Sequence, residues 1–199
     1  MKTRALLTAA ILCLAGPAFA QGTTTTKEKS AIKKAEKSAE KTAAKAAAAM
    51  EGATARAELK DAQGQSVGEV TLTETPHGML VKGTLSNLPA GSEHAIHIHE
   101  TGKCDAPDFK TAGGHLNPKG HKHGIMSAQG KHEGDLPNLH VCADGKVEFD
   151  FFSEGLTMKD LEDKDGAAVV VHATGDDYKS DPAGNAGGRI ACGLVQAQK

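Results

Sequence analysis

Histidines gather in the middle of this chain, and their spacing is typical of a site that binds transition metals. Most of the ten histidines lie between positions 94 and 140, and the run His97-Ile98-His99-Glu100 stands among them. If this run is a β-strand, His97 and His99 project from the same face of the sheet. Two imidazole nitrogens on one rigid face suit a transition metal, although a polar strand face would carry the same pattern.

Further histidines extend this pair to two candidate metal sites. The stretch that follows the pair carries three imidazoles and a carboxylate, which suit a four-coordinate zinc ion: His115, His123, His132 and Asp135. His172 ends the apolar run Val169-Val170-Val171. Together with His97 and His99 it could form a second, all-nitrogen site, which suits copper.

The scaffold that must position these residues is predicted to be all-β. Eight short runs rich in β-branched residues are separated by Gly, Pro, Asn and Asp clusters: 54–59, 67–73, 79–85, 95–100, 139–142, 147–152, 167–172 and 190–195. This spacing favours an antiparallel sandwich or barrel. Two long Gly-rich stretches, about 101–134 and 173–189, interrupt the runs. Loops this long inside one domain are usually functional, and zinc would pin the first of them.

Length and composition indicate one such domain with an N-terminal extension. The chain has 199 residues, of which 39% are hydrophobic and 3% aromatic. Lys2 and Arg4 precede an apolar stretch and the sequence Ala18-Phe19-Ala20, a pattern typical of a secretory signal peptide over residues 1–20, cleaved after Ala20. Export would place the mature protein in an oxidising compartment, and we expect the periplasm.

Residues 21–51 form a Lys- and Ala-rich tail that is predicted to be helical or disordered. Lysines recur every four residues, at 29, 33, 37, 41 and 45, and would make one basic stripe. The stripe could contact anionic envelope surface, or the tail could be a solubilising spacer. Residues 52–199, the predicted folded domain, have a net charge of -7, which argues against nucleic acid as a partner.

Cysteine usage allows one disulfide. Cleavage after Ala20 removes Cys13 and leaves Cys104, Cys142 and Cys192. An odd number of cysteines permits at most one intramolecular bridge and leaves one free thiol. Sequence spacing alone does not choose the pair.

Several longer motifs point to a known family. In chain order they are His-Ile-His-Glu from 97, Lys-Cys-Asp-Ala-Pro-Asp-Phe from 103, Gly-Gly-His-Leu-Asn-Pro from 113, Gly-Asp-Leu-Pro-Asn-Leu from 134, and Gly-Asn-Ala-Gly-Gly-Arg-Ile-Ala-Cys-Gly from 184. Between about Glu58 and Val195 the chain resembles the copper-zinc superoxide dismutases, particularly their bacterial exported branch. The resemblance does not extend to residues 1–51.

The resemblance implies a fold, two metal sites and a disulfide. The fold would be a flattened eight-stranded antiparallel Greek-key barrel, a sandwich-like architecture with two long functional loops. Copper would be bound by His97, His99, His115 and His172, and zinc by His115, His123, His132 and Asp135, so that His115 bridges the metals. Asp176 would orient one histidine ligand from each metal, and Arg189 would stand beside copper. The disulfide would join Cys104 to Cys192, leaving Cys142 free.

Some positions depart from the family pattern. Ala95-Ile96 stands where Gly-Phe is common before the first ligand, so packing behind copper should differ. His121 could compete with His123 for zinc, but the eight-residue step from His115 favours His123. The remaining histidines, His77, His94 and His140, match no ligand position, and we expect them to be exposed to solvent.

The function implied by the resemblance is dismutation of superoxide to dioxygen and hydrogen peroxide. Copper would cycle between Cu(II) and Cu(I) while zinc stays structural, and the activity would protect the cell envelope from oxidative damage. Superoxide would be the partner, and both a monomer and a homodimer remain open. One alternative is a non-enzymatic periplasmic copper/zinc-binding module on the same fold. Another is an envelope-attached scaffold whose functional part is the Lys-rich tail.

Overall fold

Strands dominate the part of the chain that the computed structural model describes, residues 52–198. They are β1 (Thr54–Asp61), β2 (Ser66–Thr75), β3 (Gly78–Leu85), β4 (Glu93–His94), β5 (Ile96–His99), β6 (Leu139–His140), β7 (Val147–Ser153), β8 (Ala168–His172) and β9 (Arg189–Gln198). Helix is limited in this range to a 3-10 turn, Lys110–Ala112, and to α2, Met158–Leu161. Neither is long and apolar enough to cross a membrane.

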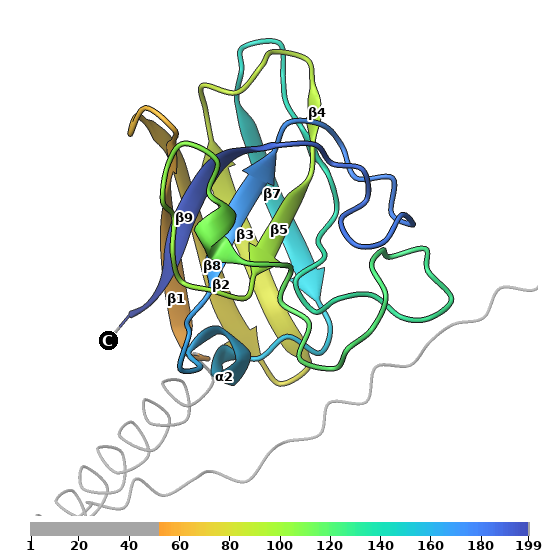
Figure 1. The fold of residues 1–199 in the computed structure, drawn as a ribbon. Helices are drawn as coiled ribbons and strands as arrows, with labels where there is room; N and C mark the ends of the chain where they lie inside the picture. The colour runs from red at the N-terminus through yellow and green to blue at the C-terminus, as the bar shows by residue number, and fades with distance from the viewer. Residues whose placement is uncertain (1–51, 199) are drawn as a thin grey trace, which may run out of the picture. The chain divides into compact units, whose positions relative to one another are not determined.

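The strands form a curled antiparallel sheet and a short ribbon (Figure 1). Seven strands follow the order β5-β8-β9-β1-β2-β3-β7, and β4 pairs with β6 in the ribbon. The prediction of an all-β antiparallel fold is confirmed. Residues 52–198 hold nine strands rather than the predicted eight, because β4 lies just before the predicted run 95–100 and pairs with β6 instead of joining the curled sheet. The N–H of Ala95 donates to the Thr174 carbonyl at 2.9 Å, so β4 and β5 belong to different sheets.

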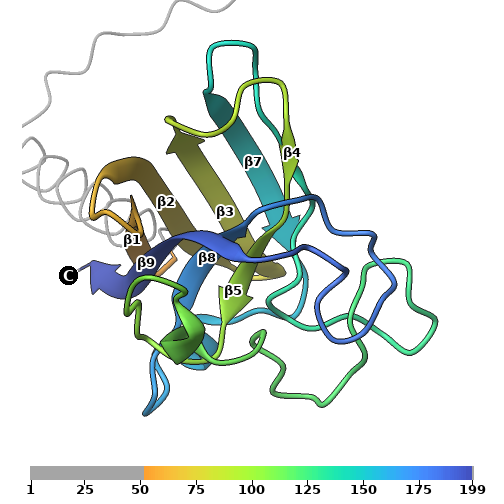
Figure 2. The same cartoon turned by 45° about the horizontal axis from the view of Figure 1, so that its top comes forward.

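The ribbon joins the two edges of the curled sheet. Within residues 52–198 the edge strands of the curled sheet are β5 and β7. Only Ala95 separates β4 from β5, and β6 is followed in the chain by β7. β6 is shorter than its predicted run because Cys142 begins the turn toward β7, where the N–H of Gly145 donates to the Cys142 carbonyl. The sheet curls so that the ribbon closes its open side (Figure 2).

Two strands are buried on both faces, and this double burial creates the interior of the site. Every residue of β5 and β8 is buried, whereas β1 alternates between buried and exposed residues. Ile96 and Ile98 of β5 belong to the main apolar core. Their neighbours His97 and His99 therefore face the other side of the sheet, where the two long loops cover them.

The first long loop returns to the sheet at two points. His115 pairs with His99, and Asp135 pairs with His97, in isolated antiparallel bridges. Gly134 permits this close approach, because a Cβ at this position would lie 2.2 Å from the Ile98 carbonyl oxygen. The two ends of segment 115–135 are therefore fixed against β5. The predicted signal peptide and Lys-rich tail lie outside the described residues.

Candidate metal centre

Four histidines converge beneath the loops, on the face of β5 that is turned away from the main core. They are His97 and His99 on β5, His172 at the end of β8, and His115 from the first loop, and all four are buried. One ligand atom from each lies within 4.8 Å of the others. The structure thus brings together the four residues of the predicted copper site.

Hydrogen bonds at Nδ1 orient the rings of His99 and His172 so that their Nε2 lone pairs point toward each other. Nδ1 of His99 donates to the Gly113 carbonyl at 3.0 Å, and Nδ1 of His172 faces the Gly187 carbonyl at 3.4 Å. A neutral imidazole that donates from Nδ1 keeps a lone pair on Nε2. The Nε2 atoms of His99 and His172 are only 3.3 Å apart. Two lone pairs so close repel each other unless a cation lies between them.

Two further nitrogens complete this set. Nδ1 of His97 and Nε2 of His115 are buried and have no hydrogen-bond partner. Buried polar atoms are nearly always satisfied, so such orphans need an explanation. A metal ion bound by four imidazole nitrogens would satisfy both, and a nitrogen-only set suits copper.

A second group of ligands lies on the other side of His115. It consists of His115, His123, His132 and Asp135, the residues predicted to bind zinc. Oδ1 of Asp135 is 2.9 Å from Nδ1 of His115, 3.1 Å from Nδ1 of His123 and 3.4 Å from Nδ1 of His132. Three imidazoles and one carboxylate match a tetrahedral zinc site.

His115 is the residue shared by both groups. Its Nδ1 faces the carboxylate of Asp135. Its Nε2 is an unpartnered atom of the first group, which we call the histidine-only group (His97, His99, His115 and His172). The ring of His115 lies 4.0 Å from the ring of His97, measured between centroids. Since the two nitrogens of one imidazole point in opposite directions, this ring can bind two ions at once.

The histidines of the two groups differ in protonation. Burial lowers the pKa of His97 to about 4 and that of His172 to about 3, and it holds the pKa of His99 well below its usual range. These three rings are therefore neutral near pH 7, the form that binds metals. Burial also acts to lower the pKa of His123, but hydrogen bonds with Asp135 and Asp176 outweigh it and raise the pKa to about 9.

The carboxylate of Asp135 makes the second group attractive to cations. Burial acts to raise the pKa of Asp135, but hydrogen bonds with His115 and His123 outweigh it and hold the pKa well below its usual range. Its other oxygen, Oδ2, accepts from the backbone N–H groups of Gly124 at 2.9 Å and His132 at 3.0 Å. The ionised carboxylate is thus fixed by the loop that it belongs to.

Asp176 accepts a hydrogen bond from one histidine of each group. Its Oδ2 accepts from Nε2 of His97 at 2.8 Å, and its Oδ1 accepts from Nε2 of His123 at 3.0 Å. Donation from Nε2 makes Nδ1 the ligand atom of each ring, and a metal ion would displace the second proton of His123 from that nitrogen. Such outer carboxylates fix the tautomer and orientation of metal-binding histidines, the role predicted for this residue.

Arg189 lies beside the histidine-only group. It is the first residue of β9 and pairs with His172. Its Nη1 donates to the Phe109 carbonyl at 2.7 Å, and its Nη2 donates to the Gly113 carbonyl at 2.6 Å. The Gly113 carbonyl also accepts from His99, so the guanidinium is positioned by the same backbone atom as a ligand histidine.

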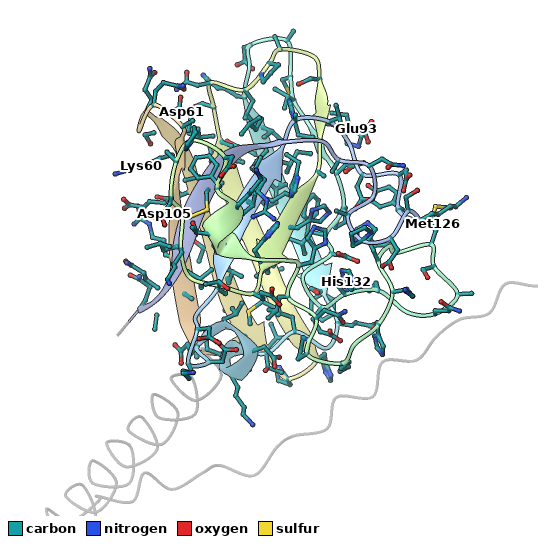
Figure 3. All side chains as sticks on the ribbon, viewed as in Figure 1. Lys60, Asp61, Glu93, Asp105, Met126 and His132 are labelled. Atoms are coloured by element: carbon teal, nitrogen blue, oxygen red, sulfur yellow. A yellow bond between two sulfur atoms is a disulfide. The ribbon has the colours of Figure 1, made fainter. Side chains whose placement is uncertain are left out.

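The disulfide joins Cys104 to Cys192 with an S–S distance of 2.00 Å, as the resemblance implied. It attaches the first loop to β9, and its yellow sulfurs lie near Asp105 (Figure 3). A small second core that includes Phe109 and Val170 packs around it. Cys142 is free and exposed.

The remaining histidines behave as expected with one exception. His77 and His140 are exposed, and His121 belongs to no group of metal ligands within residues 52–198. The expectation for His94 was wrong, because this residue is buried. Its Nδ1 donates to the carbonyl of His172 at 2.7 Å, and its Nε2 lies 2.7 Å from the Ser92 hydroxyl oxygen. His94 thus supports the backbone of a ligand histidine.

Binding of metals to these groups should raise thermal stability strongly. With both ions in thousandfold excess over their dissociation constants, each bound ion contributes about 4 kcal/mol. For a domain of this size we expect the unfolding midpoint to rise by about 8–16 °C for each ion. Calorimetry of chelator-treated protein, before and after adding zinc and copper, measures this shift. An unchanged midpoint would contradict the assignment of these groups as metal sites.

The sequence and structure resemble those of characterised proteins. Residues 66–195 match the profile of the copper/zinc superoxide dismutase (SODC) family. The Cu-Zn superoxide dismutase 1 of Aquifex aeolicus (strain VF5) is 47% identical over 145 residues, which cover 70% of this chain and 86% of the relative. That of Caulobacter vibrioides is 41% identical over 150 residues, covering 72% and 86%.

Solved structures agree with these relatives. A SOD-like protein from Bacillus subtilis superposes with a TM-score of 0.68 at 36% identity, over 71% of this chain and 97% of that one. The Cu/Zn superoxide dismutase from Brucella abortus gives a TM-score of 0.61 at 30% identity, over 72% and 99%. The chain therefore belongs to the copper/zinc superoxide dismutase family.

Proposed function

We propose that the protein is a superoxide dismutase that converts superoxide to dioxygen and hydrogen peroxide. Copper would be held by His97, His99, His115 and His172, and zinc by His115, His123, His132 and Asp135. Bound copper supplies a one-electron redox couple, whereas zinc has no accessible redox step and is structural. The observation that carries the proposal is His115, whose two ring nitrogens each face a different group of ligands.

Three residues of the chain would act on the substrate and its protons. Arg189 carries a positive charge that attracts and orients the superoxide anion beside the histidine-only group. Nε2 of His115 would hold one of the two protons that hydrogen peroxide requires whenever this nitrogen is not bound to copper. Asp176 keeps the ring of His97 in the tautomer that leaves Nδ1 free.

The overall charge of the domain makes Arg189 important for substrate approach. Superoxide is an anion, and residues 52–199 have a net charge of -7, so the local field at the site must oppose the field of the whole domain. Arg189→Ala should slow turnover by roughly tenfold or more and flatten its dependence on salt, within the range of electrostatic steering. Arg189→Lys keeps the charge and serves as the control. Unchanged rate and salt slope in Arg189→Ala would exclude this role.

We also propose that the protein acts in the periplasm and protects the cell envelope. The support is the signal-peptide pattern of residues 1–20, with cleavage after Ala20. The disulfide agrees with an oxidising compartment. Fractionation of cells that express the whole chain, with sequencing of the mature N-terminus, tests both points.

The activity itself is tested with chelator-treated mature protein that is reloaded with copper and zinc. The proposal predicts that the reloaded protein consumes superoxide catalytically and that the chelated protein does not. The alternative, a non-enzymatic metal-binding module, predicts uptake of both metals with negligible consumption of superoxide. That outcome would overturn the proposal.

A further inference from the structure

Asn138 holds the backbone of Asp176 by two hydrogen bonds. Oδ1 of Asn138 accepts from the N–H of Asp176 at 2.9 Å, and Nδ2 donates to the carbonyl of Asp176 at 2.9 Å. Asn138 is buried and lies directly before β6, far from Asp176 in sequence. An amide side chain both donates and accepts, so it pairs with one residue's N–H and C=O as a neighbouring strand would.

Asn138 is itself fixed by two other residues. Its Nδ2 also donates to Oε1 of Glu93 at 2.7 Å, and its own N–H donates to the hydroxyl of Tyr178 at 2.7 Å. Glu93 lies on β4 (Figure 3), and Asn138 leads into β6. The ribbon that closes the curled sheet is therefore hydrogen-bonded to the loop that carries Asp176.

Packing leaves this arrangement little freedom. A Cβ at Gly175 would lie 3.2 Å from Nδ2 of Asn138 and 3.2 Å from Cγ of Glu93. This distance is tighter than an ordinary contact between carbon and polar atoms. The residue before Asp176 therefore lies directly against the side chains of Asn138 and Glu93.

From this geometry we infer that Asn138 is a positioning residue for both metal sites, acting through Asp176. The inference rests on the proposed function, since it assumes that the two groups bind metals. Asp176 contacts His97 in one group and His123 in the other, so its orientation sets the ring orientation on both sides. Mutation of partners outside the ligand set typically lowers metal affinity 10–100-fold.

The test is a double-mutant cycle on affinity for each metal, measured by competition with chelators. Asn138→Leu keeps the approximate shape and removes every side-chain hydrogen bond, so we expect copper and zinc affinities to fall by about 10-fold or more. Asp176→Ala should lower both at least as much. In the Asp176→Ala background, Asn138→Leu should have little further effect, because its action passes through the missing carboxylate.

Controls separate this inference from a general loss of structure. Glu93→Gln retains an oxygen for Nδ2 of Asn138, so its metal affinities should stay near the wild-type values. If Asn138→Leu does not fold, Asn138→Ala replaces it, because alanine also removes both hydrogen bonds to the backbone of Asp176 and cannot overfill the site. Unchanged affinities in a folded variant, or fully additive losses in the double mutant, would overturn the inference. Wild-type protein that binds neither metal would instead contradict the proposed function.

Discussion

Replacing His115 with alanine should abolish superoxide consumption and weaken the binding of both metals. The variant removes Nε2 from the histidine-only group and Nδ1 from the group that contains Asp135. Loss of a residue that only hydrogen-bonds to a metal ligand typically lowers metal affinity or activity about 10–100-fold. Loss of a ligand that both sites share should therefore lower activity by more than about 100-fold. Metal analysis and superoxide consumption, measured on the same preparation, test this prediction.

His140→Ala is the matched control for this variant. His140 is exposed on β6 and belongs to neither group, so its replacement should leave metal content and activity unchanged. A His115→Ala protein that lost only one metal would show that the ring serves a single site. Retention of both metals and of activity would remove His115 from the centre altogether.

Gly184→Ala should have the next largest effect, although the change adds a single methyl group. A Cβ at Gly184 would lie 1.7 Å from Oδ1 of Asp176 and 2.7 Å from Nε2 of His123. The backbone φ of +62° also favours glycine. The carboxylate must therefore move away from His123, and we expect zinc affinity to fall by about 10–100-fold.

Gly188→Ala provides the comparison for this change. Gly188 lies in the same loop, and a Cβ there would meet no atom within 4 Å. We expect its zinc affinity, measured by competition with a chelator, to match that of the wild type. Equal losses in both variants would point to a general effect on the loop rather than to the collision with Asp176.

The ligand histidines could be predicted because their positions follow from local spacing. The alternation of a strand places His97 and His99 on one face, and the long loop between strands needs an anchor, which explains the placement of His115, His132 and Asp135. Asp176, Arg189 and the disulfide pairing came from the resemblance to a family, since no local pattern identifies them.

Residues that act through long-range contacts could not be predicted in this way. His94 is the clearest example, because its contact with the carbonyl of His172 spans 78 positions. Asn138 stands in the motif Gly-Asp-Leu-Pro-Asn-Leu, but only the folded structure shows that its amide faces Asp176. Strand β4 was not predicted for the same reason, since Glu93 pairs with the distant His140 of β6.

Anomalous diffraction from crystals of the copper- and zinc-loaded protein, recorded at the absorption edge of each metal, tests the central claim most directly. We predict one copper peak beside Nε2 of His115 and one zinc peak beside Nδ1, on opposite sides of the same ring. A single metal peak, or two peaks with the ring of His115 away from either of them, would contradict the shared site from which the proposed chemistry is derived.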